Sequence, residues 1–82
     1  MTRVRVTRIA AALAAVIAAN RRKRGWTILK LSQRAGMNVS HLSVLESGKN
    51  TFNVYTMFML CDALDMRPSE LLRQAEEQLG MQ

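Results

Sequence analysis

The chain has few of the residues that build disulfide-bonded, metal-bound or membrane-spanning proteins. Its 82 residues include one cysteine, Cys61, one histidine, His41, and one proline, Pro68. A single cysteine forms no intramolecular disulfide, and one cysteine with one histidine excludes a Cys/His-rich zinc site. The longest apolar run, residues 9–19, is about half the length that crosses a bilayer. No segment alternates apolar and polar residues over a useful length, so strands are not expected.

What is present fits one small helical domain spanning residues 1–82. Apolar residues make up 49% of the chain and charged residues 22%, which is typical of a globular protein. No linker or repeat divides the sequence. We expect a core over about residues 7–79 and a basic N-terminal arm over residues 1–6, which is either disordered or a helical extension.

The positive charge is concentrated in the N-terminal part of the chain. The net charge is +6, yet residues 1–50 hold ten Lys or Arg and one acid, Glu46, whereas residues 51–82 hold two Arg and five acids. This asymmetry favours a polyanion as the partner of the basic half. The alternative is that the run Arg21 to Arg24 is only a solvated helix end, where cations are favoured in any case.

The N-terminus has the outline of a signal peptide, because basic residues precede the apolar run. Against that reading, the run is mostly alanine and the basic residues 21–24 follow it directly. Ile9, Leu13, Val16 and Ile17 fall on one helical stripe instead, which predicts a helix over residues 9–24. We therefore expect a cytoplasmic protein without a membrane partner.

Capping residues divide the remainder into four further helices. The predicted N-caps are Thr27, Asn38 and Asn53, and Pro68 opens the last helix, which ends before Gly80. The core stripe of the fourth helix is predicted to contain Val54, Met57, Phe58, Cys61 and Leu64. The expected fold class is all-α with five helices.

Four segments of the sequence together resemble the Cro/repressor, or XRE-type, helix-turn-helix family. They are RGWT at 24–27, LSQRAGMN at 31–38, LSVLESGK at 42–49 and LCDALDMRPSELL at 60–72. The resemblance covers about residues 9–73 and implies a five-helix, lambda-repressor-like domain in which residues 38–47 form the recognition helix. It implies a transcription regulator such as a repressor, which binds an inverted-repeat operator in double-stranded DNA as a homodimer. It also implies a nucleoid-associated protein encoded by a bacterium or a phage.

The resemblance also assigns roles to individual residues. Base contacts are expected from Asn38, Val39, Ser40, Ser43 and Val44. Phosphate contacts are expected from Arg22, Lys23, Thr27, Lys30, Arg34, His41, Lys49 and Asn50, with Arg21 as a further candidate. Arg21 and Glu46 are expected to form a structural ion pair, the alternative being an unpaired surface acid. Tyr55, Met59, Leu72 and Leu79 are expected at the dimer interface.

Four positions depart from the family pattern. Ile28 stands where the family often has a DNA-contacting glutamine, and Asn20 replaces an apolar residue of the first helix. Two of the main base-reading positions are valines, which can contact only a thymine methyl group. These departures predict modest specificity, with DNA shape carrying part of the discrimination.

No enzyme, cofactor, metal or small-molecule ligand is expected. Nothing in the sequence places a second ligand or a carboxylate pair beside His41, so we expect it to contact phosphate or solvent rather than a metal. Cys61 is interpreted as a buried apolar residue, with a redox sensor as the alternative.

Two functions remain open. The first is the dimeric operator-binding regulator, and the second is a protein-interaction module with only non-specific DNA affinity, suggested by Ile28, Val39 and Val44.

Overall fold

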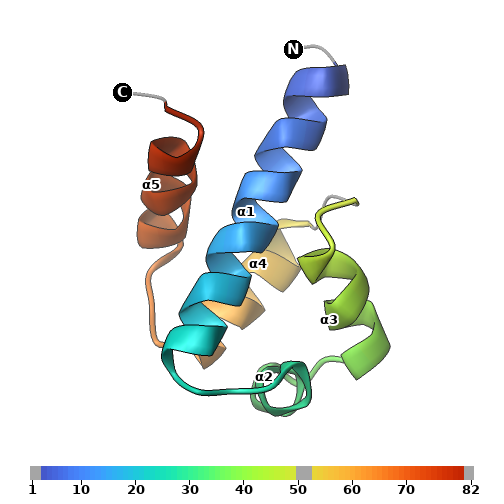
Figure 1. Cartoon of the computed structure of the whole chain (residues 1–82). Helices are drawn as coiled ribbons and strands as arrows, with labels where there is room; N and C mark the ends of the chain where they lie inside the picture. The colour runs from blue at the N-terminus through green and yellow to red at the C-terminus, as the bar shows by residue number, and fades with distance from the viewer. Residues whose placement is uncertain (1–2, 50–52, 81–82) are drawn as a thin grey trace.

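The computed structural model describes residues 3–49 and 53–80, with side chains from Arg8 onward in the first helix. These residues form five helices and no strand, so the predicted all-α fold with five helices is confirmed (Figure 1). The helices are α1 (Arg3–Lys23), α2 (Ile28–Ala35), α3 (Val39–Glu46), α4 (Val54–Ala63) and α5 (Pro68–Gln78). Of the two states considered for the N-terminal residues, the helical extension is observed from Arg3 onward.

The helices begin where the sequence places capping residues. The side-chain oxygens of Thr27, Asn38 and Asn53 each accept a hydrogen bond from a backbone N–H two or three residues further on. Pro68 is the first residue of α5, and the Glu70 carboxylate accepts the backbone N–H of Arg67 at 3.1 Å. These bonds satisfy N–H groups that have no partner within their own helix.

Two glycines are required by the geometry around α3. Gly36 has a φ of 68°, the left-handed conformation that ends α2 and turns the chain toward α3. Gly48 follows α3 with a φ of 76°, and a Cβ there would lie 3.2 Å from the Ala11 Cα of α1. A side chain at position 48 would therefore strain the backbone and push α3 away from α1.

The core forms around α1, which packs against α3 and α5 (Figure 1). Its buried alanines, among them Ala12 and Ala14, let neighbouring helices approach closely, and α5 lies antiparallel beside it. The fully buried large side chains come from all five helices and the link after α4. They are Ile17, Leu31, Leu42, Leu60, Leu64, Leu71 and Cys61.

The predicted core stripe of α4 is wrong at two positions. Val54 and Phe58 point away from the core, with 65% and 54% of their surface exposed. The buried residues of α4 are Thr56, Leu60 and Cys61. Because Thr56 takes a buried position, the true stripe of this helix begins with a polar residue that an apolar pattern passes over.

Candidate nucleic-acid interface

Helices α2 and α3 form a helix-turn-helix unit with a three-residue turn, residues 36–38. The two helices are held together from the inside, because Leu31 and Ala35 of α2 and Leu42 and Leu45 of α3 are buried in one core. Met37 in the turn packs against the same core. This arrangement fixes the direction of α3 relative to the rest of the domain.

The outward face of α3 carries small side chains and one histidine. Val39, Ser40, His41, Ser43 and Val44 are all exposed. The two valines have 40% and 46% of their surface in solvent. A helix that carries such short side chains can approach a surface closely, and this face bears no charged carboxylate or long cation.

Asn38 is tied to the start of α3. Its Oδ1 accepts the backbone N–H groups of Ser40 at 2.8 Å and His41 at 3.2 Å. A bidentate contact to adenine needs both the oxygen and the nitrogen of the carboxamide, and the cap already uses the oxygen. Only the amide N–H₂ group of Asn38 is therefore available to DNA while the cap is intact.

A two-pronged ion pair fixes the C-terminal end of α3 to α1. Arg21 donates through Nε to Glu46 Oε2 at 2.9 Å and through Nη2 to Oε1 at 3.0 Å. Its Nη1 also donates to the Trp26 carbonyl oxygen at 2.8 Å. The side chains of the pair are 9% and 6% exposed. Arg21 is thus occupied within the domain, which leaves phosphate contacts to other cations.

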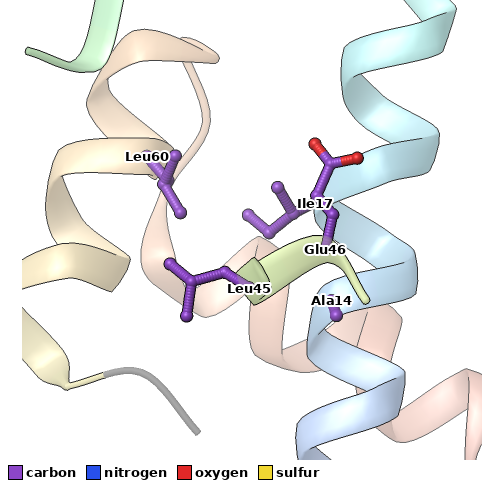
Figure 2. Close-up of a pocket in the computed structure, with 5 residues that line it drawn as sticks. All are labelled: Ala14, Ile17, Leu45, Glu46 and Leu60. Carbon is purple, nitrogen blue, oxygen red and sulfur yellow. The ribbon is translucent and has the colours of Figure 1, made fainter. Parts of the chain in front are cut away.

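The contact among α1, α3 and α4 lies beside this ion pair. Figure 2 shows Leu45 extending from α3 toward Leu60 of α4, with Ala14 and Ile17 of α1 beside Glu46. The gap that these five residues line has no room for a water molecule. It is a packed joint between helices and offers no space for a ligand.

Five cations that the sequence assigns to phosphate contacts are exposed, although Lys23 shares a surface pocket with Asp65 and Glu70. Arg22 and Lys23 lie at the end of α1, Lys30 and Arg34 on α2, and Lys49 after α3, all of them exposed. His41 and Thr27 are exposed as well, although the Thr27 hydroxyl oxygen already accepts the Lys30 N–H. Asn50, the remaining expected phosphate contact, lies outside the described residues.

Two arginines near the α1–α2 link make contacts that the sequence did not reveal. Arg24 donates to the carbonyl oxygens of Asn20 and Leu64, and so joins the ends of α1 and α4. The Arg34 guanidinium lies 4.6 Å from the centre of the Trp26 ring. Stacking of this kind orients a guanidinium that remains exposed.

The structure explains both polar and apolar departures from the family pattern. Ile28 is half-buried and packs against the core, so it is not part of an exposed apolar surface. Asn20 donates through Nδ2 to Gln74 Oε1 at 3.0 Å and to the Val16 carbonyl oxygen at 2.8 Å. This polar residue in α1 therefore links α1 to α5.

The residues expected at a dimer interface lie on α4, on α5 and directly after α5. Tyr55, with 74% of its surface exposed, and Leu72 are open to solvent, whereas Met59 and Leu79 are half-buried. Leu79 packs against the core of its own chain. Val54 and Phe58 add to the exposed apolar side chains of α4, and sequence reasoning missed them because it assigned them to the core.

Cys61 is on the inner side of α4 and has 1% of its surface exposed. Burial, with a smaller effect of the nearby Glu70 charge, raises the pKa of this thiol from 9.0 to about 11.

Within residues 3–49 and 53–80, no three His, Cys, Asp or Glu side chains gather where they could hold a metal ion. None of the helices in those ranges is both long and apolar enough to span a membrane.

Comparison with known proteins places this geometry in a family. Residues 17–71 match a helix-turn-helix family model. Over 60 residues, 71% of each protein, the chain is 32% identical to an uncharacterized HTH-type transcriptional regulator, YozG, of Bacillus subtilis.

Solved structures share the fold at lower identity. One is the clp gene regulator ClgR from Corynebacterium glutamicum, with a TM-score of 0.83, 24% identity, and coverage of 88% of this chain and 77% of that one. Another is the restriction-modification controller protein C.AhdI from Aeromonas hydrophila, with a TM-score of 0.72, 22% identity, and coverage of 76% and 94%. The relatives and the fold are those of transcription regulators rather than enzymes. The chain belongs to the Cro/repressor, or XRE-type, helix-turn-helix family, as a transcriptional regulator with a helix-turn-helix DNA-binding domain.

Proposed function

We propose that this protein binds a specific operator in double-stranded DNA as a homodimer, with α3 of each protomer in the major groove. The operator is an inverted repeat whose half-sites lie about one helical turn, roughly 34 Å, apart. Where such an operator overlaps a promoter, the bound dimer excludes the polymerase, which would make the protein a repressor.

The arrangement of charge around α3 carries this proposal. Glu46 is the single acid among residues 1–50 of the sequence, and both of its carboxylate oxygens bind Arg21. No other carboxylate in this half of the chain competes for the exposed cations of α1 and α2. The exposed cations of residues 1–50 therefore have no free acid within their own half of the chain, and such a charge balance suits binding to phosphates.

The proposed contacts divide into two sets. Arg22, Lys23, Thr27, Lys30, Arg34, His41, Lys49 and Asn50 position the duplex through its phosphates. Asn38, Val39, Ser40, Ser43 and Val44 face the base edges. The first set supplies most of the affinity and its salt dependence, and the second supplies the sequence preference.

The proposed dimer contact uses the exposed side of α4 with Leu72 of α5. Val54, Tyr55 and Phe58 expose large apolar side chains close together on α4, which monomeric proteins rarely do without a partner. We add Val54 and Phe58 to Tyr55, Met59, Leu72 and Leu79 as the interface. The acids of this half of the chain, among them Asp62 and Glu76, disfavour contact with phosphates.

Selection from random DNA duplexes over a series of salt concentrations tests the operator. The bound fraction is sequenced at each salt concentration. An enriched inverted repeat, together with an affinity that falls steeply with salt, is expected. A steep salt dependence without any enriched sequence would contradict sequence-specific binding and would leave only a non-specific grip on DNA.

A charge variant with a matched control tests the phosphate contacts. Arg22→Gln is expected to weaken binding to all sequences alike and to lower the salt slope by about 1. Arg73→Gln removes an exposed arginine of α5 whose partner is Glu77, and DNA affinity is expected to stay unchanged. Equal losses for the two variants would show that net charge, and not the position of Arg22, determines binding.

Tyr55→Ala combined with Phe58→Ala tests the dimer in sedimentation equilibrium. The dissociation constant of the dimer is expected to rise at least about tenfold, because aromatic side chains dominate interface energies. Leu29→Ala, on an exposed apolar residue of α2, serves as the control and is expected to leave the dimer intact. An unchanged dimer in the double variant would place the interface elsewhere.

The second candidate function is a protein-interaction module with non-specific DNA affinity. It is favoured by the exposed apolar residues Leu29, Val39 and Val44 on α2 and α3. The double variant Val39→Ser and Val44→Ser discriminates between the two functions. Loss of a protein partner with unchanged non-specific DNA affinity would support the module, whereas loss of operator preference supports the regulator.

A further inference from the structure

The outward face of α3 carries two valines and two serines in a regular arrangement. Ser40 and Val44 are four residues apart on one helical row, and Val39 and Ser43 form the adjacent row. Each turn of this face thus presents one isopropyl group and one hydroxyl group. The inference that follows rests on the proposed function, because it concerns what this face meets in the major groove.

The chemistry of the groove limits what an isopropyl group can recognise. Base edges in the major groove present hydrogen-bond donors and acceptors to a protein, and their apolar feature is the methyl group on C5 of thymine. A 5-methylcytosine carries the same methyl group at the same ring position. Valine forms no hydrogen bond, so a valine over an unmethylated pyrimidine or a purine edge would bury polar atoms without a partner.

The hydroxyl groups of Ser40 and Ser43 give little discrimination by themselves. A serine hydroxyl both donates and accepts, so it is compatible with several bases. Asn38 cannot form the bidentate adenine contact while its Oδ1 caps α3. The two valines are therefore the side chains of this face with the most selective chemistry.

The structure also holds the valines in place. A β-branched side chain in a helix has essentially one χ1 rotamer, so little side-chain entropy is lost on contact. Buried Leu42 and Leu45 fix the inner side of α3, and the Glu46 carboxylate fixes its end to Arg21. A short, preorganised isopropyl group can then reach a base only if the helix lies deep in the groove, which the small neighbouring serines permit.

We propose that Val39 and Val44 read pyrimidine C5-methyl groups, and that these methyl contacts set the sequence preference of the protein. Each operator half-site accordingly contains thymine at the contacted positions. A 5-methylcytosine at such a position would present its C5 methyl group in place of that of thymine. Methylation of a cytosine there would therefore create a contact with the valine.

The test measures affinity by fluorescence anisotropy on the operator found by selection. Each thymine is replaced in turn by deoxyuridine, which removes the methyl group and keeps every hydrogen-bonding group. Replacement at a contacted thymine is expected to weaken binding about fourfold per methyl group. Changing the same T·A pair to C·G, with or without a C5 methyl group on the cytosine, distinguishes the two methyl sources, and methylation is expected to restore affinity.

Variants of α3 assign the effect to the valines. In Val44→Ala and Val39→Ala the penalty for deoxyuridine is expected to disappear at the positions that each valine contacts. Ser43→Ala, on the same face, is expected to change affinity equally for thymine and deoxyuridine operators. Both valines are exposed, so thermal unfolding of the variants is expected to match that of the parent chain.

Three results would overturn the proposal. Equal affinity for thymine and deoxyuridine operators would exclude methyl reading while leaving the enriched operator, and so the proposed function, in place. A deoxyuridine penalty that persists in both alanine variants would assign the methyl effect to DNA shape. A selection that enriches no sequence at all would remove the proposed function and the inference together.

Discussion

Helices α3 and α4 are built alike at their starts and differ on their outward faces. Asparagine caps both through its side-chain oxygen, Asn38 in one and Asn53 in the other. Outward, however, α3 presents serines and valines, whereas α4 presents valine, tyrosine and phenylalanine. The shared start shows that capping decides where a helix forms, while the exposed residues decide what it can contact.

The two helices are also anchored differently. Core contacts of α4 come from Thr56, Leu60 and Cys61, and those of α3 from Leu42 and Leu45 with the Glu46 ion pair at its end. The anchor of α3 is thus apolar along the helix and ionic at its C-terminal end, whereas the buried residues of α4 include no charged group.

Removing the Glu46 carboxylate is expected to have the largest effect on α3. Glu46→Ala leaves the Arg21 guanidinium buried without its partner, which should lower the free energy of unfolding by about 4 kcal/mol. Glu77→Ala breaks the exposed pair with Arg73 and should cost less than about 0.5 kcal/mol. Urea unfolding measures both, and equal losses would show that the buried pair does not anchor α3.

Substitutions at two adjacent residues of α3 should affect different properties, stability in one case and DNA binding in the other. Leu45→Ala removes a buried side chain, with an expected loss of about 3 kcal/mol in the free energy of unfolding. Val44→Ala should change stability by less than about 0.5 kcal/mol and should weaken operator binding. Urea unfolding and anisotropy titrations test this pair. Normal operator affinity in Val44→Ala would remove Val44 from the interface.

Removal of either asparagine cap should lower stability by the same amount, but only one of the two removals should weaken DNA binding. Asn38→Ala and Asn53→Ala are each expected to lower the free energy of unfolding by about 1 kcal/mol. Only Asn38→Ala should also weaken DNA binding, because that cap sits at the start of α3. Thermal unfolding with parallel anisotropy measurements tests this, and an equal loss of DNA binding in Asn53→Ala would contradict the division between the helices.

Treatment of the native protein with a thiol reagent should affect DNA binding least, because buried Cys61 is expected to react slowly. With the pKa of the thiol raised to about 11, the thiolate fraction at pH 8 is about 100-fold lower than for a thiol of pKa 9.0. Native protein should therefore react with a thiol reagent at least about 100-fold more slowly than urea-unfolded protein. A folded-state pKa above the unfolded value means that this contribution to stability is complete below about pH 9 and falls toward pH 11. Rapid native labelling that abolishes DNA binding would favour a redox sensor.

Much of the fold could be predicted because its signals are local. A capping side chain acts on N–H groups two or three residues away, so Thr27, Asn38 and Asn53 gave the helix starts correctly. The Arg21–Glu46 pairing was expected from resemblance to a family and not from the residues themselves. The contacts of Asn20 with Gln74 and of Arg24 with Leu64 join positions 54 and 40 residues apart. Nothing in the local sequence indicates them.

The sequence by itself determined where α2 to α5 begin, which half of the chain is basic, and which small side chains α3 carries. Only the tertiary structure decided that α4 buries Thr56 and exposes Phe58, and that Asn20 of α1 binds Gln74 of α5. The physical reason is that periodicity gives a helix an apolar stripe, whereas its rotation about its own axis is set by the neighbours against which it packs.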